Sequence, residues 1–142
     1  MSGKGEAKFI GLVKSAGQPS KIEIFPEFCL GLEGLSGFSH VIVLYWFHMR
    51  DDNKERATLQ VVPRRHPDAP RVGVFASRSP NRPNPIGLCV VELIGIEGCI
   101  LAVNGLDALE GSPIIDIKPY FARADALPKA SAPEWASRGD PT

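Results

Sequence analysis

The feature that most constrains the fold is a succession of short apolar and β-branched segments, separated by glycine, proline and charged residues. Eight such segments occupy residues 8–13, 21–25, 39–48, 57–62, 71–76, 86–97, 99–104 and 112–118. Gly98 separates two of them in the manner of a hairpin turn. No helix-length periodic pattern alternates with these segments, and no GxGxxG follows the first one. Seven or eight closely spaced strands with little helix predict an all-β barrel or sandwich.

Three local patterns refine this expectation. Residues 39–48 form the most hydrophobic run and predict a central strand that is buried on both faces. Pro26 precedes residues 28–32, which we expect to form one or two helical turns. Residues 1–7 are small and polar, and we expect a frayed start there.

The C-terminal part of the chain has a different composition. We expect one domain over residues 1–128 and an irregular tail over residues 129–142, where alanine, proline and scattered charges replace the strand pattern. Trp135 is the large apolar residue of this tail. It either pins the tail against the barrel or docks on a partner subunit.

A proline-rich loop over residues 75–88 joins two of the predicted strands. It contains three prolines, two asparagines, two serines and the arginines Arg78 and Arg82. Proline fixes φ at its own position and biases the preceding residue away from helix, so the loop is suited to a single shape. Its arginines would present planar donor forks to a carboxylate or phosphate. We interpret it as a ligand-binding loop, with a stiff surface loop bearing solvated arginines as the alternative.

Charge is balanced over the chain but concentrated locally. Sixteen basic and sixteen acidic residues give a formal net charge of zero, which argues against attraction of the whole molecule to nucleic acid or an acidic membrane. Between residues 63 and 82, however, five arginines and His66 face a single acid, Asp68. The sequence therefore predicts a basic patch around the proline-rich loop.

The three cysteines show no metal-ligand spacing. Cys89 and Cys99 lie in apolar runs and are interpreted as small core residues, and the odd number with Cys29 favours a reducing compartment. The first fifteen residues contain no continuous apolar block, and no segment reaches membrane-spanning length. We therefore expect a cytoplasmic protein without a membrane partner.

Two further clusters are candidates for chemistry. His48 follows the aromatic pair Trp46-Phe47, where a histidine either acts on a ligand near neutral pH or bonds a backbone carbonyl. Residues 104–120 carry the carboxylates Asp107, Glu110 and Asp116. These either act in a site or pair with Arg78 and Arg82. No zinc ligand set, GxSxG or P-loop is found, and we expect no metal.

Residues 73–88 (GVFASRSPNRPNPIGL) closely resemble the signature of the TsaA-like (YaeB-like) family, which includes the tRNA methyltransferase O enzymes. Residues 34–40 (GLSGFSH) and 45–48 (YWFH) are similar to its upstream blocks. Residues 105–113 (GLDALEGSP) and 116–120 (DIKPY) are similar to its downstream blocks. The match runs in order from about residue 8 to about residue 128.

The resemblance implies a small closed or partly open β-barrel that binds S-adenosylmethionine and forms a homodimer, with the cofactor near the subunit interface. It also implies methyl transfer to N6 of threonylcarbamoyladenosine beside the tRNA anticodon. Carried over by position, the cofactor contacts are Gln18, His48, Met49, Arg78, Leu88, Glu110, Gly111, Ser112 and Pro113. In chemical terms, Arg78 suits the methionine carboxylate and Leu88 suits the adenine.

The chain departs from the family at two of these positions. Members usually carry a longer first loop with a Pro-Arg-Gln element, of which Ala16-Gly17-Gln18 retains only the glutamine. The usual Asp-Gly-Thr-Pro turn is replaced by Glu110-Gly111-Ser112-Pro113. The resemblance therefore supports cofactor binding more strongly than it supports the tRNA acceptor.

For the reaction we expect positioning and desolvation to dominate, with His48 assisting proton removal from the acceptor nitrogen and Asp107 or Glu110 second. Nucleic-acid contacts are expected from Arg64, Arg65, Arg71 and Arg82. Two other functions remain open at this point. One is a non-enzymatic module that binds S-adenosylmethionine, and the other is a methyltransferase for another RNA or a small molecule.

Overall fold

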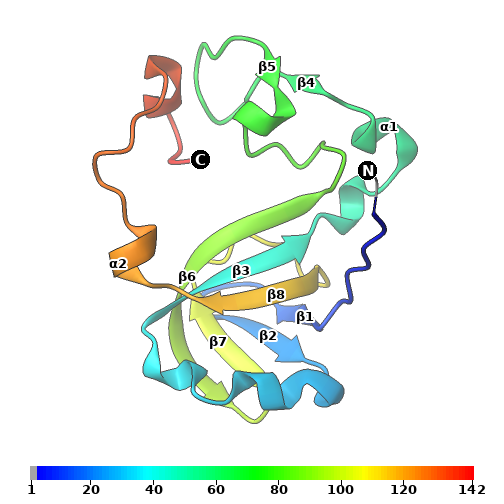
Figure 1. The fold of residues 1–142 in the computed structure, drawn as a ribbon, viewed down its shortest axis with the longest axis vertical. Coiled ribbons are helices and arrows are strands. Elements are labelled where there is room, and N and C mark those ends of the chain that lie inside the picture. The colour runs from blue at the N-terminus through cyan, green and yellow to red at the C-terminus, as the bar shows by residue number, and fades with distance from the viewer. Residues whose placement is uncertain (1–2) are drawn as a thin grey trace. The chain divides into compact units, whose positions relative to one another are not determined.

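The computed structural model describes residues 3–142, so the expected frayed start at Met1 and Ser2 lies outside the described residues. The chain divides into two compact units (Figure 1). The barrel unit contains the chain up to Trp46 together with Gly87–Phe121, and the loop unit contains Phe47–Ile86 and Ala122–Thr142. Each unit is described separately below.

The barrel unit is built on six strands that close into a barrel. They are β1 (Gly11–Ser15), β2 (Ser20–Ile24), β3 (His40–Trp46), β6 (Ile86–Glu97), β7 (Ile100–Asn104) and β8 (Pro113–Pro119). Their order around the barrel is β1-β2-β7-β6-β3-β8, and β8 pairs with β1 to close it (Figure 1). The pairings of β1, β2, β7 and β8 with their neighbours are antiparallel. The predicted β-barrel is therefore confirmed.

The core follows the period-two alternation of these strands. Val41, Val43 and Tyr45 of β3 are buried, whereas the residues between them are half-exposed. The prediction that residues 39–48 are buried on both faces is thus wrong. A closed barrel has one interior, and only alternate side chains of a strand can reach it. The remaining fully buried aliphatic residues of the barrel come from all its other strands, namely Val13, Ile22, Val91, Leu101, Val103 and Ile114.

Between β2 and β3 the chain forms two short 3-10 helices, η1 (Pro26–Leu32) and η2 (Leu35–Gly37). The predicted helical turns after Pro26 are therefore confirmed. Cys29 in η1 forms a disulfide with Cys99, next to the β6–β7 turn. The interpretation of Cys99 as a free core residue is wrong, because the fold brings together two cysteines separated by 70 positions in the sequence. Cys89 is the free cysteine of the described chain.

The loop unit has little regular structure. It contains η3 (His48–Arg50), α1 (Asn53–Arg56), β4 (Gln60–Val61), β5 (Val72–Gly73), η4 (Val74–Ala76), α2 (Ala122–Asp125) and η5 (Glu134–Ser137). The strands predicted over residues 57–62 and 71–76 shrink to β4 and β5, two residues each, which pair only with each other. Pro63 and Pro70 are each separated by one residue from the paired ends Val61 and Val72, and proline lacks the N–H that a longer ladder would need.

The C-terminal segment belongs to this loop unit. The ring of Trp135 packs against the ring of His66, with centroids 5.4 Å apart and the planes inclined by 70°. This contact is not the predicted one against the barrel, because His66 belongs to the loop unit; Trp135 holds the tail against the basic segment around His66. No helix in residues 3–142 combines the length and the apolar composition that a membrane crossing requires.

Candidate functional site

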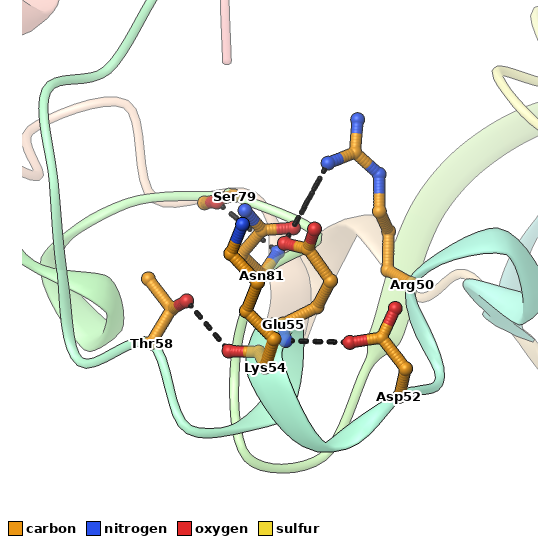
Figure 2. Close-up of polar contacts among 7 residues, drawn as sticks. All are labelled: Arg50, Asp52, Lys54, Glu55, Thr58, Ser79 and Asn81. Carbon is orange, nitrogen blue, oxygen red and sulfur yellow. Dashed lines mark hydrogen bonds and ion pairs between the residues drawn. The ribbon is translucent and has the colours of Figure 1, made fainter.

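The proline-rich loop is held in shape by its own polar side chains. The Ser77 hydroxyl donates to the carbonyl of Val74 at 2.9 Å and accepts from the amide of Ser79 at 3.3 Å. The Ser79 hydroxyl accepts in turn from the amide of Asn81 at 3.2 Å (Figure 2). Two successive turns of this kind, each closed by a serine, fix the loop locally.

Arg82 completes this internal bracing. One guanidinium nitrogen, Nη1, donates to the carbonyls of both Ser77 and Ser79 at 3.1 Å. Arg82 is half-buried, whereas Arg78 in the same loop is exposed and has no hydrogen bond or ion pair within residues 3–142. The two arginines that the sequence presents as equivalent therefore differ. Arg82 stabilises the loop and Arg78 is available to a ligand.

The turn that carries His48 and Met49 is tied to the same loop. The amide of Phe47 donates to the carbonyl of Pro85 at 2.7 Å, and the amide of Arg50 donates to the carbonyl of Phe47 at 2.9 Å. His48 is half-buried, and Met49 is 68% exposed. The structure thus places His48 and Met49 on a turn that is hydrogen-bonded to the loop that bears Arg78.

Two more arginines strengthen this connection. The guanidinium of Arg50 donates to the Asn81 side-chain oxygen at 3.1 Å, which Figure 2 shows as the link from the helical turn to the proline-rich loop. Arg56 donates through Nε to the carbonyl of Pro83 at 2.8 Å and pairs with Asp51 at 3.0 Å. Arg56 belongs to α1, which Asp52 caps by accepting from the amide of Glu55 at 2.7 Å (Figure 2). These supporting roles are not signalled by the sequence, where Arg50 and Arg56 resemble ordinary surface residues.

In the barrel unit, residues 105–112 between β7 and β8 are anchored near their start. The Gln18 side-chain oxygen accepts from the amide of Gly105 at 3.2 Å, and the thiol of Cys89 donates to the carbonyl of Gly105 at 3.1 Å. The hydroxyl of Tyr45 donates to the carbonyl of Asp107 at 2.7 Å. The predicted residue Asp107 thus lies on a braced segment, and the predicted residue Gln18, in the β1–β2 connection, is one of its braces. Sequence reasoning gave Tyr45 no role, although it begins the block 45–48 that resembles the family and lies near the end of the predicted central strand.

The end of this segment, residues 110–113, is anchored to β1. The amide of Gly111 donates to the carbonyl of Val13 at 2.8 Å, and the amide of Val13 donates to the carbonyl of Ser112 at 2.9 Å. Gly111 has φ +87°, a left-handed conformation that favours glycine. Ser112 is buried, whereas Glu110 is exposed. The turn is therefore rigid and presents its carboxylate to solvent.

Leu88 lies on the outer face of β6 and is 47% exposed. Val90 and Ile94, two and six positions further along, are also large, apolar and about half exposed. Residues separated by two positions point to the same face of a strand, so Leu88 and Val90 lie side by side on the outside of the barrel. Ile94 extends this apolar stripe beyond the exposed Glu92, at a shift in the β6–β7 register. Such a stripe suits an apolar ligand face or another protein surface better than water.

The two units differ sharply in charge. All nine arginines lie in the loop unit, which has eleven basic and seven acidic residues. The barrel unit has five lysines and nine acidic residues. The balanced total therefore combines a loop unit with an excess of four positive charges and a barrel unit with an excess of four negative charges.

The predicted basic residues are exposed in the loop unit. Arg64, Arg65 and Arg71 are all solvent-accessible, and Arg64 and Arg71 make no hydrogen bond or ion pair with any residue of the described chain. Arg123 on α2 is likewise exposed and unpaired among residues 3–142, although the sequence pattern did not single it out. The guanidinium groups of Arg64, Arg71 and Arg123 are therefore available to anions, whereas Arg65 also donates to the hydroxyl of Thr142 at 3.5 Å.

One of the candidate carboxylates has a structural role. Asp116 pairs with Lys118 at 2.9 Å and also accepts from the amide of Ile117. The hydrogen bond from Lys118 to Asp116, reinforced by their charge attraction, raises the pKa of the lysine. Asp116 is thus engaged on its own strand. No group of three or more metal-binding side chains occurs in the described part of the chain.

The amino-acid sequence was compared with family models and with known proteins. Residues 12–126 match the model of the tRNA-methyltransferase O N-terminal domain. A protein of Methanothermobacter thermautotrophicus named probable S-adenosyl-L-methionine-binding protein is 53% identical over 110 residues, which are 78% of this chain and 75% of that protein. The tRNA (adenine(37)-N6)-methyltransferase of Escherichia coli is 42% identical over 127 residues.

The solved structures agree with the sequence matches. The crystal structure of TrmO from Pseudomonas aeruginosa superposes with a TM-score of 0.70 at 33% identity, covering 90% of this chain. The match covers 61% of that protein, and the match to the Escherichia coli enzyme covers 53% of its length. The chain therefore spans little more than half of these two bacterial relatives.

Proposed function

Because this chain belongs to the family of the tRNA-methyltransferase O N-terminal domain, we propose that it binds S-adenosylmethionine and transfers the methyl group to N6 of a tRNA adenosine. The finer acceptor that we propose is threonylcarbamoyladenosine beside the anticodon. The observation that carries the proposal is Arg78, which is exposed and unpaired within residues 3–142 on a loop that is braced on both sides.

The residues present fit the cofactor. An unpaired guanidinium on a rigid loop suits the methionine carboxylate, because its planar fork can bind both oxygens. Leu88 offers an apolar surface to an adenine. The rigid turn of Glu110, Gly111, Ser112 and Pro113 would present backbone groups to the polar atoms of the cofactor. Gln18, His48 and Met49 complete the proposed binding set.

When bound, the cofactor supplies a methyl group already activated by a positively charged sulfur. The protein's main task is then to position the acceptor nitrogen in line with that methyl group and to exclude water. The carboxylates of Glu110 and Asp107 favour a cationic ligand nearby. His48 accepts the proton that the nitrogen loses, with Asp107 or Glu110 as the second candidate.

The loop unit supplies the surface for tRNA in this proposal. Arg64, Arg65 and Arg71 are exposed and would contact backbone phosphates. Arg82 acts through the shape of the proline-rich loop, since its guanidinium is bonded to two loop carbonyls. The cytoplasm is the proposed location because of the proposed tRNA acceptor; the Cys29–Cys99 disulfide means that the cysteines no longer support the reducing compartment expected from their odd number.

The apolar stripe on β6 supports a homodimer. Leu88, Val90 and Ile94 are each between 44% and 52% exposed, which is unfavourable for large aliphatic side chains left in water. A second copy seated on this stripe would cover them and would place Leu88 at the subunit interface. The molar mass from light scattering should then be that of a dimer for the wild type and that of a monomer for Ile94→Lys.

The cofactor half of the proposal is tested by calorimetric titration with S-adenosylmethionine. We expect Arg78→Met to weaken binding by roughly tenfold to hundredfold, the range for loss of a charged hydrogen bond. Arg123→Met is the matched control, because Arg123 is also exposed and unpaired among the described residues but lies on α2. Equal affinities for the two variants would refute the assignment of Arg78.

The transfer half is tested with methyl-labelled cofactor and total tRNA, followed by nucleoside analysis. Label in an N6-methylated adenosine supports the proposal, and we expect His48→Ala to lower turnover while it retains cofactor binding. Full turnover of His48→Ala would exclude His48 as the proton acceptor.

One observation favours a second function, a non-enzymatic module that holds S-adenosylmethionine. Only four residues, 16–19, connect β1 to β2, so the first loop lacks the arginine that the family usually carries there. Cofactor binding without any transfer of label to RNA would select this alternative. Label in a different nucleoside or in a small molecule would instead show that the protein is a methyltransferase for another acceptor.

A further inference from the structure

The C-terminal residues 134–142 pack against residues 64–68. We call the first segment the clip and the second the basic loop. His66 of the basic loop is 7% exposed and its Nδ1 donates to the carbonyl of Arg138 at 2.7 Å. The same ring packs edge-on against Trp135 of the clip. A buried histidine whose ring is bonded on one edge and packed by an indole fixes the loop at its centre.

Arg138 holds the far end of the basic loop. Its Nη1 donates to the carbonyls of Pro67 and Asp68, at 3.2 and 3.4 Å, and its Nη2 pairs with Glu134 within the clip. Asp68 has φ +59°, a left-handed conformation that costs energy in a residue other than glycine. The guanidinium therefore supports a loop conformation that the local sequence does not favour.

The near end of the basic loop is held by backbone contacts. The amide of Asp140 donates to the carbonyl of Arg65 at 3.1 Å. Gly139, with φ +73°, passes so close that a Cβ at this position would lie 2.0 Å from the same carbonyl oxygen and 2.8 Å from Cδ of Pro67. Only glycine fits there, so the clip and the basic loop are shaped to each other.

We infer that the clip is a positioning element for anion recognition, because it holds the basic loop in the one shape that presents Arg64 and Arg65 together to the phosphates of an RNA backbone. Both arginines are exposed while their neighbour His66 is buried, so the clip holds the loop by its centre and backbone. The Arg65 guanidinium also donates to the hydroxyl of Thr142 in the clip at 3.5 Å, so the clip positions this side chain directly as well. The clip itself does not contact the RNA in this inference, because the Arg138 guanidinium is already bonded to the carbonyls of Pro67 and Asp68 and to the Glu134 carboxylate. This inference rests on the proposed RNA partner and adds a residue set to it.

The first test is Gly139→Ala, which places a methyl group against Arg65 and Pro67. Gly98→Ala is the matched control, because Gly98 has φ +62° and no atom within 4 Å of a Cβ. Both variants pay the cost of a left-handed alanine, but only the first one displaces the clip. The probe is an anticodon stem-loop RNA, titrated at several salt concentrations.

We expect Gly139→Ala to bind the RNA about tenfold more weakly, as the fraction of protein with a competent loop falls. The slope of log affinity against log salt should also decrease by roughly 1.5 to 2, the loss of two phosphate contacts. Gly98→Ala should have the RNA affinity and the salt slope of the wild type. The affinity for S-adenosylmethionine should be the same in the wild type and in both glycine variants. Equal RNA affinity and slope in the two glycine variants, or tighter binding by Gly139→Ala, would overturn the inference.

A second pair of variants keeps the test decisive if Gly139→Ala folds poorly. The amide nitrogen of an asparagine occupies about the position of histidine Nδ1, whereas that of a glutamine lies near Nε2. His66→Asn should therefore retain the bond to Arg138 and most of the RNA affinity, and His66→Gln should lose both. Trypsin cleavage after Arg64 and Arg65 should be faster in His66→Gln than in His66→Asn, and the same rate in both would contradict the clip.

The outcomes separate this inference from the proposed function. Wild-type protein that fails to bind the RNA would refute the RNA partner and the inference with it. Wild-type binding that Gly139→Ala and His66→Gln leave unchanged would refute the clip alone.

Discussion

The barrel unit and the loop unit reach a defined structure by different means. The barrel has six strands, long backbone ladders and a core of fully buried aliphatic side chains. The loop unit has two strands of two residues each, and Val74 is its one fully buried aliphatic side chain among the described residues. In place of a core it uses serine turns, prolines and arginines bonded to backbone carbonyls.

Arginine accounts for much of this contrast. Arg56, Arg82 and Arg138 are half-buried in the loop unit, and each donates to the carbonyl of a loop. A guanidinium can satisfy two carbonyls that no ladder reaches, and it tolerates partial burial because its charge is delocalised. Arginines that are bonded to loop carbonyls therefore shape the loops, whereas exposed arginines without such bonds remain available to anions.

The largest effect that should separate the units is a cavity in the barrel. Leu101 of β7 is fully buried, and we expect Leu101→Ala to lower the free energy of unfolding by about 3 kcal/mol. Leu30→Ala in η1 is the control, since Leu30 is 89% exposed and its truncation should cost less than about 1 kcal/mol. Urea denaturation measures both. Similar losses would mean that the barrel core is not what stabilises this unit.

The next effect concerns the covalent link that only the barrel unit has. Replacing both Cys29 and Cys99 by serine removes a bond that closes a long loop, and we expect a loss of about 2–4 kcal/mol. Cys89→Ser is the control, because a hydroxyl can still donate to the carbonyl of Gly105. Urea denaturation of the wild type with and without reductant should reproduce the difference. An unchanged midpoint on reduction would contradict a stabilising role for the disulfide.

The sequence predicts the barrel better than it predicts the loop unit. Strand β6 has the predicted limits, residues 86–97, because alternation and a flanking glycine turn are local signals. The strands predicted at 57–62 and 71–76 have the right composition but only a two-residue ladder. The disulfide was not predictable either, because a link across 70 residues depends on the closed fold.

The candidate site shows the same limit. Its cofactor contacts were predicted from the resemblance. The structure places His48, Met49 and Arg78 in the loop unit, and Gln18, Leu88 and residues 110–113 in the barrel unit. Nothing local to the sequence distinguishes Arg82, which is bonded to two carbonyls, from Arg78, which is exposed. Which arginine supports a loop depends on where the loop carbonyls point, and a sequence motif does not specify that direction.

A smaller effect should appear when the brace of the proline-rich loop is removed. Arg82→Met keeps the apolar stem but loses the bonds to Ser77 and Ser79, and we expect a local loss of about 1–3 kcal/mol. Hydrogen exchange should accelerate in residues 77–84 and remain unchanged in the barrel strands. Arg123→Met, on exposed α2, should leave exchange in the loop as in the wild type. Exchange in Arg82→Met as slow as in the wild type would show that prolines and serines are enough to hold the loop and that the loop unit does not depend on this arginine.

The smallest effect should come from one of the three side-chain braces of the barrel's 105–112 segment, the bond from the Gly105 amide to Gln18, which acts beside the bonds from Tyr45 and Cys89. Both residues are exposed and the distance is 3.2 Å, so water can replace the bond when it is lost. We therefore expect Gln18→Leu to cost less than about 1 kcal/mol in urea denaturation, with Gln18→Glu, which keeps an acceptor, closer to the wild type. A loss above about 2 kcal/mol would mean that the barrel, like the loop unit, depends on side-chain braces. If stability is unchanged but S-adenosylmethionine binds several-fold more weakly, Gln18 acts on the ligand through the 105–112 segment or directly.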